Sequence, residues 1–67
     1  MERIPVESSN MMSIGWDNGI LEIEFKGNKV YQYFGVPKEV YTSMMLAESA
    51  GKFFHANIKG KYSYDSV

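Results

Sequence analysis

Aromatic rings and lysines are the residues of this chain best suited to chemistry, and that chemistry is the non-covalent binding of an aromatic anion. The chain has ten aromatic side chains among 67 residues, and positions 52–61 hold three lysines, one histidine and no acidic residue. Aromatic rings stack on nucleic-acid bases, while lysines contact phosphates. The sequence therefore predicts a ligand-binding set of nine residues: Trp16, Tyr31, Tyr33, Lys52, His55, Asn57, Lys59, Lys61 and Tyr62.

The same residues also have a simpler explanation. A solvent-exposed face accounts for the lysines. A place in the hydrophobic core accounts for Trp16, Phe53 and Phe54, because large rings in small domains are usually buried. Tyr31 and Tyr33 fit an interface between proteins as well as a stacking surface. The sequence leaves both explanations open.

Catalysis and metal binding have little support in the sequence. His55 is the only histidine, cysteine is absent, and no Gly-x-Ser-x-Gly nucleophile turn occurs. Ser49 is better explained as a helix cap, and Glu22 and Glu24 as the polar side of a strand. One histidine without a neighbouring acid cannot assemble a zinc site, and no glycine-rich phosphate loop is present. The sequence predicts no catalytic residues, no metal site and no cofactor, and therefore no enzyme.

The overall charge favours a small ligand over a long nucleic acid. The net charge is −1, unlike the basic balance of domains that grip long nucleic acids. Residues 1–24 hold five acidic residues and one arginine, whereas residues 25–67 hold six lysines and three acidic residues. A small anion needs only a few well-placed cations, and the second part of the chain can supply them.

The length allows one domain, which we expect to span residues 1–67. No cysteine is available for disulfides, so packing must stabilise the fold, and association into a homo-oligomer would add buried surface. A dimer or tetramer is expected, because a small sheet leaves edge strands that need a partner or a cover. No signal-peptide pattern and no membrane-length apolar run occurs, so the cytoplasm is the expected location.

Three segments alternate between apolar and polar residues as strands do. They are residues 11–16, 20–26 and 30–34, with turn sequences at 17–19 and 27–28. Alternation in the first segment predicts one face with Met12, Ile14 and Trp16 and another with Met11, Ser13 and Gly15. Alternation in the second segment predicts a core face with Leu21, Ile23 and Phe25 and a water-facing side with Glu22, Glu24 and Lys26.

The turn at 27–28 decides which way the two tyrosines of the third segment point. A two-residue loop pairs Phe25 with Val30 and places both tyrosines on the polar face. A three-residue loop, with Asn28 in the left-handed conformation, pairs Phe25 with Lys29 and places them on the core face. Because asparagine tolerates that conformation, we favour the three-residue loop.

Two helices are predicted after the strands. Pro37 begins the first, whose apolar positions are Val40, Tyr41, Met44 and Met45. Ser49 caps a second, shorter helix that Gly60 ends, with turns that carry Phe53, Phe54, Asn57 and Ile58. Residues 62–64 form either a last strand or a docked tail. The predicted fold is α+β: a three-stranded antiparallel β-meander packed on one α-helix, followed by a short helix and a C-terminal extended segment.

The order and spacing of several motifs resemble the KTSC domain, a small module named after the C-terminus of some lysyl-tRNA synthetases. The resemblance covers about residues 6–62, the expected core of the domain. It rests on Ser8-Ser9, Gly15-Trp16-Asp17, residues 21–25, Tyr31-Gln32-Tyr33, Val36-Pro37, Val40-Tyr41, residues 47–54 and Ile58. The chain departs from the family pattern with Trp16 for tyrosine, Asn28 for glycine, His55 for asparagine and Lys59 for arginine. Lysine in place of arginine keeps the charge but weakens bidentate phosphate recognition.

Three functions are consistent with these residues. The first is non-enzymatic binding of a nucleotide or cyclic nucleotide by a small homo-oligomer that sequesters it, as small phage-encoded proteins do with host nucleotide signals. The second is binding of tRNA or single-stranded RNA, which has been suggested for the family and which the resemblance implies. The third is a protein-interaction module, because methionines are adaptable contact residues: Met11, Met12, Met44 and Met45.

Overall fold

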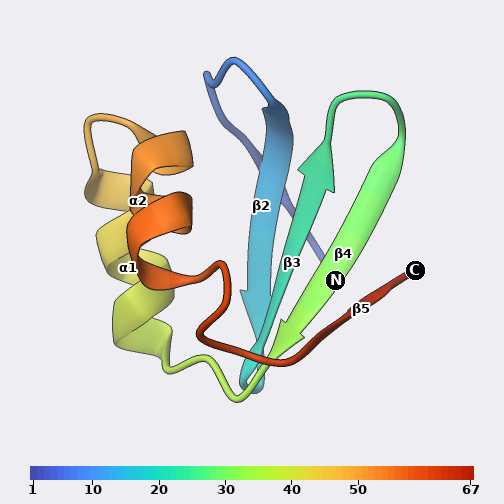
Figure 1. Cartoon of the computed structure of the whole chain (residues 1–67), viewed down its shortest axis with the longest axis vertical. Coiled ribbons are helices and arrows are strands. Elements are labelled where there is room, and N and C mark those ends of the chain that lie inside the picture. The colour runs from blue at the N-terminus through green and yellow to red at the C-terminus, as the bar shows by residue number, and fades with distance from the viewer.

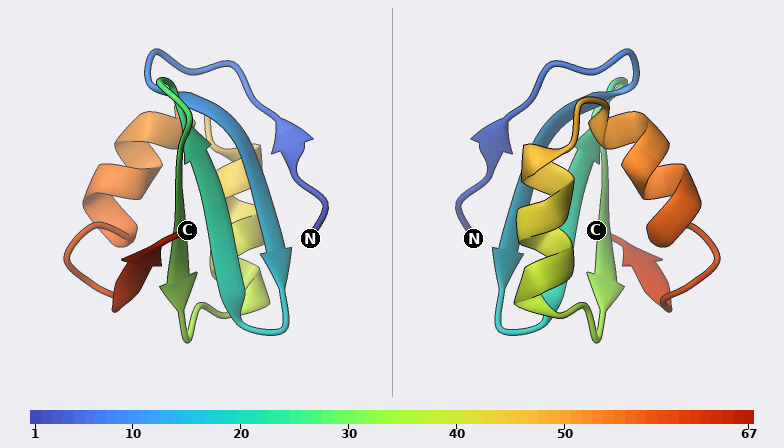
Figure 2. Two further views of the ribbon diagram at one scale, coloured as in Figure 1. Left: turned by 90° about the vertical axis from the view of Figure 1, so that its right-hand side faces the viewer. Right: turned by 90° about the vertical axis from the view of Figure 1, so that its left-hand side faces the viewer.

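The computed structural model describes all residues from 1 to 67 and has an α+β fold (Figure 1). The antiparallel sheet has the strand order β1-β2-β3-β4-β5, and both helices lie on one of its faces (Figure 2). The predicted meander corresponds to β2-β3-β4, and one further short strand lies at each of its edges. The elements are β1 (Ile4–Pro5), β2 (Met11–Asp17), β3 (Ile20–Phe25), β4 (Lys29–Phe34), α1 (Lys38–Leu46), α2 (Ala50–Asn57) and β5 (Tyr64–Ser66).

The hairpin between β3 and β4 has the predicted three-residue loop. Phe25 pairs with Lys29, and Asn28 has a positive φ of 63°, in the left-handed region. The same register sets Tyr31 opposite Ile23 in the neighbouring strand. The side chains of β4 at positions 29, 31 and 33 therefore share the face that the helices cover, because a strand alternates with a period of two.

A β-bulge in β2 makes the predicted faces of its first residues wrong. Met11 pairs with Phe25, and the next paired residue, Ser13, opposes Glu24, so Met12 has no partner across the ladder. The extra residue reverses the alternation at this point. Met11 consequently lies in the core at 1% exposure, whereas Met12 is 47% exposed.

The helices begin and end close to the predicted positions. Pro37 is the N-cap of α1, so the helix begins one residue later than predicted, at Lys38. Ser49 is the N-cap of α2 as predicted, and its hydroxyl accepts a hydrogen bond from the Lys52 backbone N–H at 3.1 Å. Gly60 follows α2 with a φ of 77°, a conformation that glycine adopts without strain.

The face of the sheet opposite the helices carries a polar network. Arg3 donates hydrogen bonds to the Ser13 hydroxyl, at 3.0 Å, and to the Glu22 carboxylate. Gln32 also donates to Glu22, at 2.8 Å. Glu22 is only 8% exposed, so the prediction that it faces water is wrong. The N-terminal segment that carries Arg3 covers this carboxylate.

Gly15 allows the N-terminal segment to lie against the sheet. A Cβ atom at this position would clash with the carbonyl oxygen of Glu2 and lie 3.0 Å from Cγ of Arg3. A glycine inside a strand often marks such a close approach of two backbones. The position of Arg3 over the carboxylates therefore depends on Gly15.

The hydrophobic core lies between the sheet and the two helices. Neither helix has the length and apolar content that crossing a membrane would require. The predicted stripe of α1 contributes one fully buried residue, Met44, while Val40, Tyr41 and Met45 are partly buried against the core. The buried cluster consists of Met11, Ile14, Leu21, Ile23, Tyr33, Val36, Met44, Ala50, Phe54 and Ile58.

Candidate ligand-binding site

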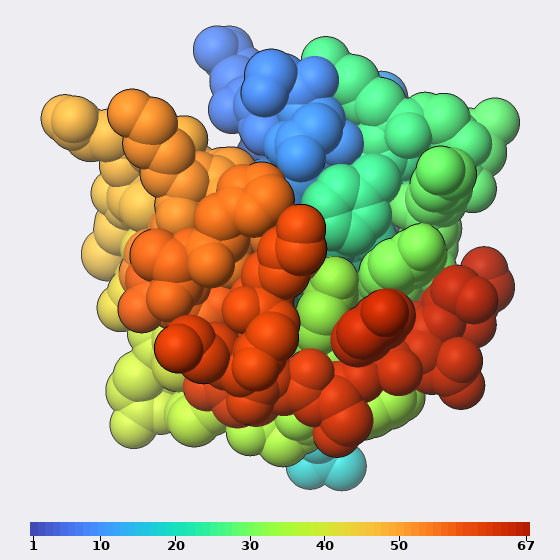
Figure 3. Space-filling model, viewed as in Figure 1, coloured from blue at the N-terminus to red at the C-terminus, as the bar shows by residue number.

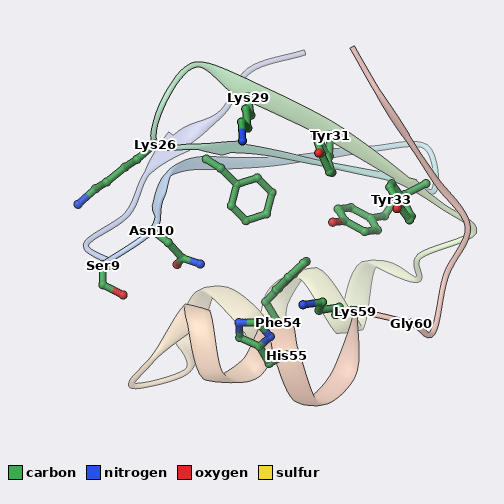
Figure 4. A pocket seen from close by; sticks show the side chains of 12 residues that line it. Ser9, Asn10, Lys26, Lys29, Tyr31, Tyr33, Phe54, His55, Lys59 and Gly60 are labelled. Atoms are coloured by element: carbon green, nitrogen blue, oxygen red, sulfur yellow. The ribbon is translucent and has the colours of Figure 1, made fainter.

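A groove of about 660 Å³ lies between the sheet and α2. In the space-filling view it opens between the orange surface of α2 and the green and red strands (Figure 3). Figure 4 shows the side chains from the sheet facing those of α2 and the segment that follows it. We call it the aromatic groove; its lining consists of Ser9, Asn10, Phe25, Lys26, Lys29, Tyr31, Tyr33, Phe54, His55, Lys59, Gly60 and Tyr64.

Five aromatic rings in this lining form a closed circuit of contacts. Phe25 packs edge-on against Tyr31, with ring centroids 5.7 Å apart, and Tyr31 stacks on Tyr64 at 5.6 Å and an interplanar angle of 9°. Tyr64 contacts Tyr33 at 5.5 Å. Phe54 closes the circuit, with centroid distances of 5.6 Å to Tyr33 and 5.5 Å to Phe25. Such distances fall in the range of favourable aromatic pairs.

The circuit is anchored in the core on one side and exposed on the other. Tyr33 and Phe54 are each only 5% exposed, whereas Tyr64 is 61% exposed. Phe25 and Tyr31 are partly buried against the core cluster. The groove therefore has a fixed aromatic base and one ring at its open side.

Positive charge surrounds the aromatic base on both walls. Lys26 lies in the β3–β4 loop and Lys29 begins β4, while His55 projects from α2 and Lys59 follows that helix (Figure 4). The lining contains no aspartate or glutamate. Asn10 adds an amide group, and its backbone carbonyl accepts a hydrogen bond from the Lys26 N–H at 2.9 Å. The groove thus combines apolar rings with cations, without a competing anion.

Burial, with smaller contributions from the neighbouring Tyr64 and Tyr31, raises the pKa of Tyr33 to about 12. At neutral pH its hydroxyl is therefore protonated and can donate a hydrogen bond. The folded-state pKa of Tyr33 lies above the ordinary tyrosine value of 10.0. The contribution of the protonated hydroxyl to stability is therefore complete below about pH 10 and is lost as the pH rises towards 12.

We expect one tyrosine to ionise with a midpoint near pH 12, together with loss of folded structure. Ultraviolet absorbance of tyrosinate and circular dichroism, followed over the same alkaline titration, measure both events. In Tyr33→Phe the component with this midpoint is expected to disappear. If the absorbance curves of the two proteins differ only in amplitude at lower pH, Tyr33 is not the residue with the raised pKa.

Comparison with known proteins identifies the family. The KTSC domain model matches residues 7–62 of this chain. The chain belongs to the KTSC domain family. A crystal structure of a KTSC domain protein from Yersinia pestis matches with a TM-score of 0.95 and 44% sequence identity, over 98% of this chain and 96% of that chain. The resemblance found in the sequence is therefore confirmed.

Two further proteins are similar to this chain in sequence. An uncharacterized protein from Stutzerimonas stutzeri is 36% identical over 64 residues, which are 92% of this chain and 90% of that protein. A lysine–tRNA ligase from Trichormus variabilis is 43% identical over 47 residues, which are 70% of this chain but only 8% of the ligase. Related sequence is thus found both in proteins of similar size and within a much larger enzyme.

The fold of this KTSC domain brings four of the nine predicted ligand-binding residues together. Tyr31, Tyr33, His55 and Lys59 line the aromatic groove. The other five do not line it. Lys52, Lys61 and Asn57 are exposed, and the Asn57 side-chain amide donates a hydrogen bond to the Phe53 carbonyl of the same helix. Tyr62 is partly buried against the core. The fifth residue is Trp16.

Trp16 lies in a separate part of the KTSC domain. Its indole N–H donates a hydrogen bond to the Val36 carbonyl at 2.8 Å, and its ring stacks on Tyr41 with centroids 6.4 Å apart. It borders another hollow, of about 340 Å³, which includes the acidic residues Glu2 and Asp17. Its contacts join β2 to α1 and to the segment between β4 and α1.

Sequence reasoning did not assign the other eight lining residues to the site, and Phe54 was expected only in the core. The same alternation that pairs Tyr31 with Tyr33 also places Lys29 on their face, so Lys29 could have been found from the favoured register. The sequence predicts Phe25 on the core face, and in the structure its ring also lines the groove. Lys26 lies in the groove because of the position of the hairpin loop, and Tyr64 because of the position of β5. The sequence pattern contains no clear signal for either position.

Proposed function

We propose that this KTSC domain binds an anionic ligand with a planar aromatic ring in the aromatic groove, and that this ligand is a nucleotide. The observation that carries the proposal is the composition of one lining: five aromatic rings and three lysines, with no acidic side chain. Rings stack on a base with little dependence on its identity, and lysines contact phosphate oxygens. Nucleotides carry both groups in one molecule.

The size of the groove supports a small ligand. A volume of about 660 Å³ is within the range of about 300–1,000 Å³ found for small-molecule sites. Three lysines are enough for one phosphate chain, whereas affinity for a long duplex grows with the number of phosphates that a protein neutralises. The net charge of the whole chain is −1, which also disfavours long-range attraction of a polyanion.

The chemistry of the lining supports binding without conversion. Hydrolysis or group transfer needs a nucleophile or water with a base that activates it, commonly supported by a metal ion. His55 is the only imidazole in the groove, and no carboxylate lies there to orient it. We therefore propose that the domain holds its ligand and does not act as an enzyme.

Titration calorimetry with ATP, GTP, UTP, cyclic AMP and cyclic dinucleotides tests the proposal, and the chain supplies matched controls. Lys59→Gln and Lys29→Gln remove cations from the groove, while Lys52→Gln and Lys61→Gln remove exposed lysines outside it. We expect each groove substitution to weaken binding about 10-fold, the effect of losing one charge-assisted contact. The control substitutions are expected to leave the affinity unchanged.

Two results would overturn this proposal. No heat with any nucleotide at high micromolar concentration would exclude nucleotide binding. An equal loss of affinity in the Lys52→Gln or Lys61→Gln control would show that general charge, and not the groove, attracts the ligand.

Single-stranded RNA is the second candidate ligand, and the match within a lysine–tRNA ligase favours it. An RNA that uses the same three lysines would show a log–log salt dependence with a slope of about −2, since single strands release about 0.7 counterion per neutralised phosphate. Fluorescence anisotropy of a labelled single-stranded RNA at several salt concentrations measures this slope. Absence of binding at low salt would exclude the RNA candidate.

The proposal also includes a homo-oligomer of this domain that sequesters the nucleotide. A three-stranded meander alone would leave two free edges, which is the reason to expect a dimer or tetramer, but β1 and β5 cover those edges. Edge strands as short as these need no further partner. Native mass spectrometry of gently purified protein tests the oligomer and a sequestering role together, because it reports the assembly and any nucleotide retained with it.

A further inference from the structure

Tyr64 differs from the other rings of the aromatic groove in its freedom to move. It is 61% exposed, whereas Tyr33 and Phe54 are each 5% exposed. Phe25 and Tyr31 pack partly against the core cluster, which Tyr64 does not join. Tyr64 is therefore the one ring of the circuit that can leave its position without opening the core.

The contacts of Tyr64 allow such a movement. Its ring contacts are with Tyr31 and Tyr33, and most of the residue is exposed to solvent. The strand itself is fixed by its backbone: the Phe34 N–H donates to the Ser63 carbonyl at 2.9 Å on one side of Tyr64. Exposed side chains change rotamer within picoseconds to nanoseconds. The ring can therefore swing while β5 stays paired with β4.

The spacing of Tyr31 and Tyr64 shows how a base could be accommodated. Their rings are nearly parallel, at 9°, with centroids 5.6 Å apart. Stacked bases lie about 3.4 Å apart, so a base between two rings needs about 6.8 Å between the outer planes. Tyr64 would have to move outward by at least about 1 Å, and it is the most exposed ring of the circuit.

We propose that the Tyr64 side chain moves when the aromatic groove binds a nucleotide. Its ring swings outward, the base enters against Tyr31, and the Tyr64 ring then stacks on the other side of the base. This inference rests on the proposed nucleotide-binding function and adds to it the residue that selects for the base. The lysines contact the phosphates of any polyphosphate, whereas the Tyr31–Tyr64 pair contacts only ligands with a planar ring. Tyr64 consequently determines the preference for a nucleotide over a bare polyphosphate.

Calorimetric titrations with ATP and with inorganic tripolyphosphate separate these two contributions. In Tyr64→Ala we expect ATP affinity to fall about 5- to 150-fold, the measured range for one base–aromatic stack, while tripolyphosphate affinity stays unchanged. Tyr64→Phe is expected to retain ATP affinity, because it keeps the ring. Lys59→Gln is expected to weaken both ligands. Circular dichroism shows whether each variant is folded, and the exposure of Tyr64 predicts that it is.

The outcomes test the role of Tyr64 separately from the proposed nucleotide binding. If wild-type protein binds no nucleotide, both are overturned. If wild-type protein binds ATP and Tyr64→Ala binds it equally well, the proposed role of Tyr64 is overturned and the nucleotide site remains. If Tyr64→Ala weakens ATP and tripolyphosphate by the same factor, the ring supports the site as a whole and does not select for the base.

Discussion

Replacing Phe54 with alanine is expected to lower the free energy of unfolding by about 3–5 kcal/mol, the usual cost of deleting a buried aromatic ring. Phe54 is 5% exposed and contacts both Phe25 and Tyr33 in the aromatic circuit. The loss is severe for this chain, because a domain of 67 residues has a total stability of only about 3–10 kcal/mol. Urea unfolding at low temperature, followed by circular dichroism, measures it.

Two comparison variants make this prediction specific. Phe34→Ala removes the same ring from a side chain that is 37% exposed and is expected to cost less than about 1 kcal/mol. Phe54→Leu keeps most of the apolar volume and should lie between the two. If Phe54→Ala and Phe34→Ala destabilise the protein equally, the ring of Phe54 is not the core residue that the structure shows.

Replacing Arg3 with methionine is expected to lower the free energy of unfolding by about 2–3 kcal/mol at neutral pH. The substitution removes the donors to Ser13 and Glu22 and the ion pair with Glu24, whose closest atoms are 3.7 Å apart. Glu22 keeps only Gln32 as a donor, although it is almost completely buried. A carboxylate that is buried with too few partners carries most of this cost.

The pH dependence of stability provides the control for Arg3. The hydrogen bond from Gln32, followed by the contacts with Arg3, lowers the pKa of Glu22 against the opposing effect of burial. Because the folded-state pKa is lowered, this stabilisation is present above the ordinary glutamate value of 4.5 and is lost as the pH falls below it. Arg3→Met should flatten this acid dependence, and in a Glu22→Gln background it should cost less. Equal costs in both backgrounds would show that Arg3 acts without Glu22.

The central part of the fold could be predicted because its signals are local. The hairpin register depended on one residue, Asn28, whose left-handed conformation follows from its side chain and the turn sequence. The cap of α2 depended on Ser49, and it has the predicted hydrogen bond. Within such short segments, neighbouring residues determine the backbone conformation.

The errors arose where distant segments meet. The bulge at Met12 inverts the alternation of β2, and a single extra residue leaves no sequence signal of its own. Glu22 alternates as a solvent-facing strand residue does, but the segment around Arg3 covers it. Lys52, Lys59 and Lys61 are close in sequence, but only Lys59 lines the groove. The other two lysines of the lining, Lys26 and Lys29, come from the β3–β4 hairpin.

The connection from β4 to β5 has a consequence for how the molecule folds. Strand β2 joins β3 by a short turn, and β3 joins β4 in the same way, so the pairing of these three strands requires little loop closure. Strand β5 reaches its partner only after both helices have been traversed. We therefore expect β5 to dock after the rate-limiting step. Substitutions in it should accelerate unfolding and leave the refolding rate almost unchanged, so the open side of the groove is the last part of the native structure to form.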